Sequence, residues 1–222
     1  MSGTRDCMSD KVRKAIIDRI CDGTYAPGER LIELQIAKEF ETSQAPIREA
    51  LCKLEAMRIV ETEPYKGTRV REISLRELAE CLRIRAVLEN LAADLVEDRL
   101  LSRLPELKHK AMLTVEAARN RDLRQYSLIN MQFHRTIIEA SNNQSLLCMW
   151  DSLTPEVRMF ATVKANADNL NDGANDHLEI VEAFAEGDNR FAGKLLKKHA
   201  ESGLWIAAEN KTNKVDEQYA NS

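Results

Sequence analysis

The chain has 222 residues, with 32 lysines and arginines against 36 aspartates and glutamates, and a formal net charge of −4. This length suits two small domains, and no stretch approaches the roughly twenty apolar residues of a membrane helix or the apolar run of a signal peptide, so we expect a cytoplasmic protein. Its five cysteines are scattered without the paired spacing of a disulfide framework or a zinc knuckle, and free thiols are expected.

Residues 1–72 contain three short motifs that predict a DNA-binding module. In chain order, residues 23–31, 43–51 and 64–70 indicate a turn, a short helix entered through a polar cap, and a small hairpin with Gly67 at its tip. This layout is typical of a winged helix-turn-helix, which makes DNA the first partner to consider. The alternative is a generic helical hairpin. Residues 1–75 carry 13 basic and 13 acidic side chains, so net charge gives DNA binding no independent support.

The middle motif indicates a recognition helix. Ile47, Ala50, Leu51 and Leu54 recur at helical spacing and predict one buried stripe, which leaves a polar N-terminus outside. Ser43 suits the N-cap, where its hydroxyl accepts from a backbone N–H of the first turn. Strands around Ile59, Val60 and Val70 would form the wing. The residues expected to contact DNA are Ser43, Gln44, Ala45, Arg48, Lys66, Gly67 and Arg69.

Residues 8–71 resemble the DNA-binding domain of the GntR superfamily of bacterial transcriptional regulators. The matching motifs are Asp22-Gly23, Pro27-Gly28, residues 47–51 and the Gly67 wing. Two positions depart from the family pattern, which usually has arginine at Gln44 and glycine at Arg58. Gln44 would read adenine rather than guanine. Arg58, if it adopts the left-handed conformation that glycine takes easily, costs about 1 to 2 kcal/mol or instead offers a phosphate contact.

Residues 73–210 predict an antiparallel bundle of six or seven helices, and residues 211–222 a polar tail. Residues 74–77 form a capping box that opens a helix to about Asp98. Residues 166–175, rich in Asn, Asp and Gly, predict a loop. Further helices are expected at residues 104–119, 123–141, 144–165, 174–186 and 188–209, with Asn143 and Asp188 as N-caps.

Polar residues interrupt the apolar stripes of this bundle. Arg85 and Glu89 share a face with Leu78, Leu82, Ala92 and Val96, so the sequence places a charged pair among residues that should be buried. Glu89 either neutralises Arg85 within the protein, or Arg85 awaits the carboxylate of a ligand. The spacing leaves both interpretations open.

Three of the four histidines also lie on apolar stripes. His134 follows Asn130 by one turn, and His177 and His199 begin or continue stripes on two later helices, whereas His109 lies between lysines. Each taken singly is more often a satisfied core histidine. A metal site shared by the three in the bundle core is the alternative that the spacing leaves open.

The second half resembles the effector-binding domain of the FadR-like branch of the same superfamily, on the motifs at residues 85–89 and 130–134 and on His177 and His199. The resemblance implies a divalent metal, zinc or nickel, beside a small organic acid. The implied metal ligands are Asn130, His134, His177 and His199, and the implied acid-binding residues are Arg85 and Arg158. Asn130 departs from the usual aspartate, so metal affinity should fall or the preferred metal change.

We therefore expect a homodimer that binds a palindromic DNA operator and whose affinity for it responds to the acid. The chain is expected to be a regulator and not an enzyme. Two alternatives stay open: a regulator whose metal is purely structural, and a zinc-dependent hydrolase in which Glu89 would be the base.

Overall fold

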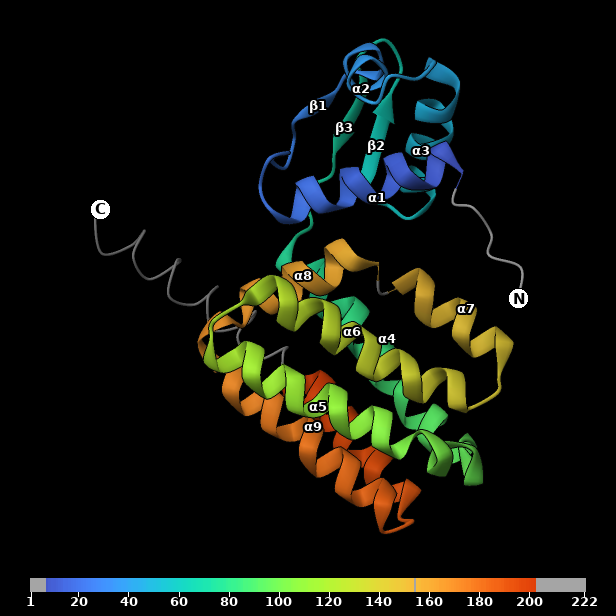
Figure 1. The fold of residues 1–222 in the computed structure, drawn as a ribbon, viewed down its shortest axis with the longest axis vertical. Helices are drawn as coiled ribbons and strands as arrows, with labels where there is room; N and C mark the ends of the chain where they lie inside the picture. Colours follow the sequence, from blue (N-terminus) through green and yellow to red (C-terminus); the bar gives the residue numbers. More distant parts are fainter. Residues whose placement is uncertain (1–6, 154, 203–222) are drawn as a thin grey trace. The chain divides into compact units, whose positions relative to one another are not determined.

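The computed structural model describes residues 7–153 and 155–202. They form two compact units, one ending at Ile73 and the other starting at Ser74. Helices dominate both units, and the first unit adds a small sheet (Figure 1). The predicted fold class, a winged helix-turn-helix followed by a helical bundle, is confirmed. No helix of the described residues is long and apolar enough to cross a membrane.

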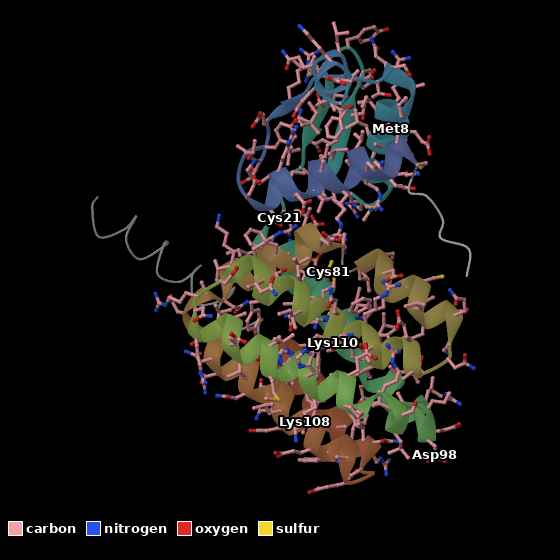
Figure 2. The ribbon with its side chains drawn as sticks, in the orientation of Figure 1. Met8, Cys21, Cys81, Asp98, Lys108 and Lys110 are labelled. Carbon is pink, nitrogen blue, oxygen red and sulfur yellow. The ribbon has the colours of Figure 1, made fainter. Side chains whose placement is uncertain are left out.

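The first unit combines three helices with three short strands. Met8 and Cys21 mark the two ends of the first helix (Figure 2). In chain order the elements are α1 (Met8–Cys21), β1 (Arg30–Leu31), α2 (Glu33–Glu39), α3 (Gln44–Ala56), β2 (Val60–Glu63) and β3 (Gly67–Val70).

Helix α3 buries the predicted stripe of Ile47, Ala50, Leu51 and Leu54. These side chains pack mainly against α1 and α2, which leaves the opposite face of α3 open to solvent. Ser43 occupies the N-cap with an extended backbone, but its side chain makes no capping hydrogen bond. The predicted contact from the Ser43 hydroxyl is therefore wrong, although the position of the cap is right.

The sheet has the order β1-β3-β2 with antiparallel pairing, and Val60 lies opposite Val70. Strand β1 was not predicted, because two residues are too short for a periodic signal. Gly67 begins β3 instead of forming the hairpin tip, which residues 64–66 make. Gly67 has a φ of 82°, and a Cβ there would lie 3.2 Å from Nε of Arg30, so any other residue at this position would be strained.

Arg58 follows α3 with a φ of 56°. This is the left-handed conformation expected if arginine stands at a glycine position, and it costs about 1 to 2 kcal/mol for a residue with a Cβ. The Arg58 carbonyl accepts from Nη1 of Arg71 at 2.9 Å, so the strained turn is tied to the segment after the wing.

The second unit is helical throughout its described part. Its helices are α4 (Leu75–Leu95), α5 (Leu104–Arg119), α6 (Leu123–Ala140), α7 (Gln144–Leu153), α8 (Glu156–Ala165) and α9 (Leu170–Ala185), with short 3₁₀ segments η1 (Glu97–Arg103) and η2 (Ala167–Asn169). A further helical stretch starts at residue 189 and continues to residue 202, where the described residues end.

Three predicted caps are confirmed in the second unit. The Ser74 hydroxyl accepts from the backbone N–H of Glu77 at 3.1 Å, and Asn143 and Asp188 accept from backbone N–H groups three residues later. The side chain of Glu77 pairs with Arg158 at 3.2 Å. The predicted ends at residues 209 and 211–222 lie outside the described residues.

Two predicted boundaries are wrong. The single helix expected at residues 144–165 is two helices, because Pro155 has no N–H to donate and disfavours helix in the residue before it. The loop expected at residues 166–175 is mostly helix, since η2 is followed at once by α9. Leu170 and Ala174 bury against Tyr126, and this packing outweighs the loop-like composition.

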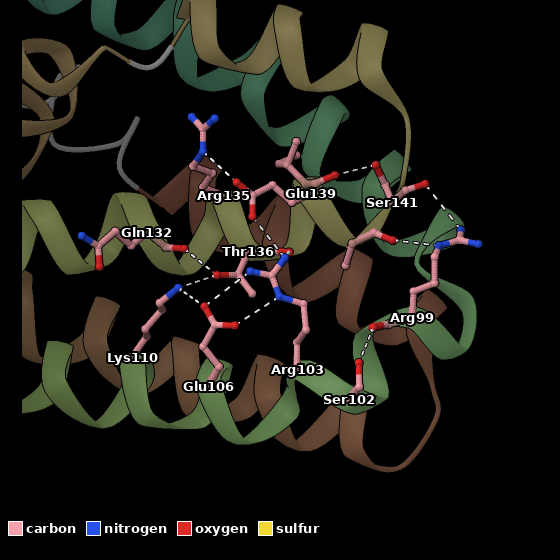
Figure 3. Close-up of polar contacts among 12 residues, drawn as sticks. Arg99, Ser102, Arg103, Glu106, Lys110, Gln132, Arg135, Thr136, Glu139 and Ser141 are labelled. Carbon is pink, nitrogen blue, oxygen red and sulfur yellow. Dashed lines mark hydrogen bonds and ion pairs between the residues drawn. The ribbon is translucent and has the colours of Figure 1, made fainter. Parts of the chain in front are cut away.

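Helix α6 packs extensively on α5, and α5 on α9. The main core lies among these helices and includes Phe133, Trp150 and Phe184. Salt bridges and hydrogen bonds reinforce one edge of this packing (Figure 3): Arg103 donates to the Thr136 carbonyl and to Glu139, and Lys110 donates to the Thr136 hydroxyl at 2.7 Å. These contacts tie the end of η1 and the start of α5 to α6.

Candidate functional site

Three of the predicted metal ligands converge inside the bundle. His134 comes from α6, His177 from α9 and His199 from the stretch after residue 189, and one nitrogen of each lies within 4.8 Å of the others. His134 and His177 are fully buried, whereas the His199 side chain is 12% exposed. The Nε2 atoms of His134 and His177 are 3.3 Å apart. The helices therefore gather three imidazoles from distant parts of the sequence.

The Nδ1 atom of each histidine faces an oxygen. Nδ1 of His177 is 3.3 Å from the Thr114 hydroxyl, which itself donates to the Ala111 carbonyl at 2.7 Å and so is left to accept from His177. Nδ1 of His199 lies 3.0 Å from Oδ2 of Asp176. Oxygen acceptors at Nδ1 place the ring proton there and leave the lone pair on Nε2.

A buried carboxylate lies beside Nδ1 of His134, as the oxygens of Thr114 and Asp176 do for the other two histidines. Its Nδ1 lies 3.0 Å from Oε2 of Glu89, although the approach is too bent for a well-aligned hydrogen bond. The negative charge of Glu89 still favours the proton on Nδ1. The Nε2 lone pairs of His134 and His177 then face each other at 3.3 Å, an arrangement that a cation between them would relieve.

Burial keeps the imidazoles of His134 and His177 neutral. It lowers the pKa of His134 to about 3, with Glu89 opposing the change and Arg85 adding to it. Burial also lowers the pKa of His177 well below its ordinary value, and the neighbouring histidines His199 and His134 add to the effect. Neutral imidazole is the form that binds a metal, so the site is ready to do so at neutral pH.

Asn130, the fourth predicted ligand, lies one turn before His134 on α6 and is 5% exposed. Its amide nitrogen lies 2.9 Å from the sulfur of Met159, while its Oδ1 is buried with no hydrogen-bond donor. A buried oxygen without a donor is costly, and a cation is one of the partners that would satisfy it. The described donor set thus fits a divalent metal: three imidazole nitrogens and a neutral amide oxygen.

Arg85 is buried beside this cluster, and its contacts agree in part with the interpretation that Glu89 neutralises it within the protein. Its Nε donates to Oε1 of Glu89 at 2.5 Å, and Glu89 also accepts from the Trp150 indole at 2.9 Å. Burial would raise the pKa of Glu89, but Arg85 and then His134 outweigh it and hold this pKa below its usual range. The Nη2 of Arg85 is buried without a partner, so Glu89 neutralises Arg85 and still leaves one nitrogen available.

A cavity of about 370 Å³ adjoins the cluster and is lined by Arg85, Asn130 and His199. Lys198 and Asp172 lie on its exposed side. Further polar lining comes from Tyr126, Thr162, Asn166, Asn169 and Asp176. A Cβ at Gly173 would lie 3.1 Å from the Tyr126 hydroxyl, so glycine keeps α9 close to this wall. The cavity is large enough for a small organic acid.

The predicted recognition helix presents its N-terminus to solvent. Ser43, Ala45 and Arg48 are exposed, and Gln44 is half-buried. Arg48 donates through Nε to Glu33 at 2.7 Å and through Nη2 to the Gln44 side chain at 3.1 Å. The four residues form one continuous patch at the start of α3.

On the wing, Lys66 and Arg69 both pair with Glu63, at 2.6 and 3.1 Å. Tyr65, between Gly67 and the end of β2, is fully exposed. The cations predicted to contact DNA are thus present on the surface and carry intramolecular partners.

Comparison with known proteins agrees with both halves of this geometry. Residues 8–70 match the gntR family of bacterial regulatory proteins, and residues 80–202 match the FCD domain. The chain belongs to the GntR family. It is a transcriptional regulator with an FCD effector-binding domain, and because the family and its relatives are regulators, the prediction that it is not an enzyme is confirmed. The zinc hydrolase alternative is thereby dropped.

Relatives of this GntR-family chain include a probable D-xylose utilization operon transcriptional repressor of Paenarthrobacter nicotinovorans, 32% identical over 93% of this chain and 92% of that protein. The gluconate operon transcriptional repressor of Bacillus licheniformis is 28% identical over 67% of this chain and 61% of that protein. Among solved structures, E. coli McbR/YncC is 24% identical, with a TM-score of 0.78 over 93% of this chain and all of that one, which supports the fold.

Arg158, the other predicted acid-binding residue, is buried. It does not line the larger cavity that contains Arg85 and His199, but it lines a smaller one together with Arg85. Its guanidinium pairs with Glu77 at 3.2 Å and donates to the carbonyls of Ser152 and Leu153. Arg158 therefore joins α4 to the end of α7, and its contact with an acid stays a prediction.

Sequence reasoning missed the groups that orient the histidines of this GntR-family regulator. Thr114 has no motif around it, and Asp176 precedes His177 in sequence but contacts His199. Glu89 was noticed only as a partner for Arg85, or as a base. A signal did exist for Glu89, because it lies on the buried stripe of α4, but its contact with His134 needed the packing of α4 on α6.

Proposed function

We propose that this regulator binds a divalent metal and a small carboxylic acid in its FCD domain, and that the acid changes its affinity for an operator. One observation carries the proposal: three histidines with oxygens beside their Nδ1 atoms each bring one nitrogen within 4.8 Å of the others, beside a cavity lined by Arg85. A structural role for the histidines alone would leave two buried lone pairs facing each other without a partner.

The metal would be held by His134, His177 and His199, with Asn130 supplying an oxygen. Imidazole donors suit zinc and nickel, the two metals we propose. When bound, the metal would offer an open position to a carboxylate oxygen. Glu89, Thr114 and Asp176 orient the three rings from behind.

The acid would occupy the cavity and meet the free nitrogen of Arg85. A guanidinium holds a carboxylate through charge-assisted hydrogen bonds, and Arg85 has Nη2 buried without a partner. Two relatives are named for the D-xylose and gluconate operons, which makes sugar acids the first to test, followed by lactate-like hydroxy acids and dicarboxylates.

Operator binding would use two copies of α3 in successive major grooves of a palindromic site in the cytoplasm. Support for a dimer comes from an exposed apolar stripe on α4, where Ile84, Val87 and Leu91 are 49%, 60% and 43% exposed at a spacing of three and four residues. Such a stripe suits a symmetric helix contact between two copies. Val87→Asp should then produce monomers in analytical ultracentrifugation and weaken operator binding.

The proposal is tested by elemental analysis of the purified protein and by operator binding in the presence of metals and acids. His199→Gln should lose bound metal and acid response and keep basal operator affinity, and His109→Ala, at the exposed histidine, is the matched control. An acid response that survives in both His199→Gln and Arg85→Met would refute the sensor function.

The structural-metal alternative is separated from this proposal by chelation. If the metal only stabilises the bundle, its removal should lower the melting temperature of the protein without changing the operator response to any acid. Under our proposal, removal of the metal also abolishes the acid response, because the carboxylate loses one of its two partners.

A further inference from the structure

The donor atoms that face the shared point of the three histidines carry no negative charge. Each histidine offers one imidazole nitrogen, and the fourth donor is the amide oxygen of Asn130. A divalent ion placed among them would receive donor atoms but no negative charge.

The nearby carboxylates already have partners. Glu89 contacts Arg85, Trp150 and Nδ1 of His134, so its charge already serves the arginine. Asp176, which lines the cavity, contacts Nδ1 of His199 at 3.0 Å. At the exposed rim of the cavity, Asp172 and Lys198 bring opposite charges that offset each other.

A buried divalent charge without a counter-charge is strongly disfavoured. Here it would also lie near Arg85, whose Nη2 already lacks a partner. An anion in the adjoining cavity solves both problems, because one carboxylate neutralises charge on the metal and satisfies Arg85. Binding of the anion without the metal is less favoured, since its only cationic partner is then Arg85, whose charge Glu89 already neutralises.

We infer that the cavity binds a divalent cation and a carboxylate as a linked pair, each raising the affinity of the other, and that the neutral side chain of Asn130 creates this dependence. The inference rests on the metal and acid binding proposed above. It makes the occupancy of the metal itself responsive to the acid. The FCD domain then responds to the metal and the acid together. It does not hold the metal permanently and respond to the acid alone.

Linkage fixes what should be measured. If the carboxylate raises metal affinity by some factor, the metal raises carboxylate affinity by the same factor, and coupling of this kind is usually about 5- to 150-fold. Asn130→Asp would place a permanent negative charge beside the metal. The metal would then bind firmly without an anion, and the coupling factor should fall towards one.

The test titrates the metal-free full-length protein with Co²⁺, whose visible absorption reports the number and type of its ligands. The titration is repeated with saturating acetate, L-lactate or D-gluconate. Ionic strength is held constant with sodium perchlorate, and the binding of Co²⁺ by each anion in solution is measured separately. Wild type, Asn130→Asp and Asn130→Ala are compared, because Asn130→Ala removes the oxygen donor without adding charge.

We expect at least one carboxylate to raise the Co²⁺ affinity of wild type about fivefold or more, and to change its absorption. Asn130→Asp should bind Co²⁺ more tightly than wild type without anion and gain little when anion is added. Asn130→Ala should bind Co²⁺ more weakly but keep the coupling factor. If Asn130→Asp does not fold, as judged by circular dichroism, wild type and Asn130→Ala still decide whether the cation and the carboxylate bind as a linked pair.

Two failures are distinguishable. If Co²⁺ binding is lost in His199→Gln but none of the three anions affects it in wild type, the linked pair is refuted and the metal site of the proposed function stands. If no Co²⁺ binding depends on His199, the metal site fails and this inference fails with it. An equal coupling factor in wild type and Asn130→Asp would also overturn the role given to Asn130.

Discussion

Substitution of Glu89 by glutamine should destabilise the FCD domain far more than the same change at a matched surface pair. Glu89 is fully buried, accepts from Arg85 at 2.5 Å and from Trp150 at 2.9 Å, and holds the only negative charge shown in contact with Arg85 among the described contacts. Glutamine keeps the shape but leaves the guanidinium charge buried without a partner. Breaking a buried ion pair in this way costs about 3 to 5 kcal/mol.

The matched control lies on the same helix. Glu80 also pairs with an arginine four residues away, Arg76 at 2.9 Å, but both side chains are more than half exposed. Exposed pairs at this spacing contribute about 0.3 to 0.5 kcal/mol, so Glu80→Gln should be nearly neutral.

Urea unfolding of the metal-free protein, followed by tryptophan fluorescence, gives the assay. Trp150 is buried in the second unit and residues 1–73 contain no tryptophan, so the fluorescence change of Trp150 reports the second unit separately from the DNA-binding unit. A loss of less than about 1 kcal/mol in Glu89→Gln, or a loss equal to that in Glu80→Gln, would refute the argument that Glu89 is the charge partner of Arg85.

Three further outcomes follow from the same contacts. Burial depresses the pKa values of His134 and His177, so their stabilising effect is complete above the unfolded pKa of about 6.5 and is lost as pH falls towards the folded values. In urea titrations below pH 6.5, the unfolding free energy of the metal-free protein should drop by about 1.4 kcal/mol per pH unit for each histidine. Arg48→Ala should cost about 1 to 3 kcal/mol in operator binding and relax specificity, whereas Lys66→Ala should weaken all DNA sequences alike; equal loss of specificity in electrophoretic mobility shifts would mean that the recognition helix is misplaced. Arg158→Met should lower the melting temperature, and calorimetry with acids tests the predicted contact of Arg158: an unchanged acid affinity would remove Arg158 from the ligand site.

The elements of the DNA-binding unit were predictable because their signals are local. The apolar stripe from Ile47 to Leu54 and the strand residues Val60 and Val70 each bury the face that their spacing indicates. Where the prediction failed, a contact distant in sequence decided the outcome. Leu170 lies in a helix because it packs against Tyr126.

The candidate site divides in the same way. His134 and His177 could be placed inside the bundle from their stripes, and Arg85 and Glu89 from their four-residue spacing. The acceptors at Nδ1 were beyond reach, because the partners of His177 and His199 are 63 and 23 residues away in sequence. The tautomers that make the cluster suitable for a metal are therefore a property of the packing, and no spacing in the sequence encodes them.

In the first unit, acidic side chains pair with the basic side chains that are predicted to contact DNA. Equal numbers of acidic and basic side chains gave no sign of a DNA-binding surface, and in the free protein Arg48 and Lys66 contact Glu33 and Glu63. Exposed pairs of this kind are weak and are screened by salt, so a DNA phosphate can replace the carboxylate at little cost. Glu63→Gln should accordingly strengthen operator binding at low salt without altering sequence preference, because it removes a competitor for Lys66 and not a base contact. Filter binding across a salt series measures this, and a changed sequence preference in Glu63→Gln would show that the wing reads bases.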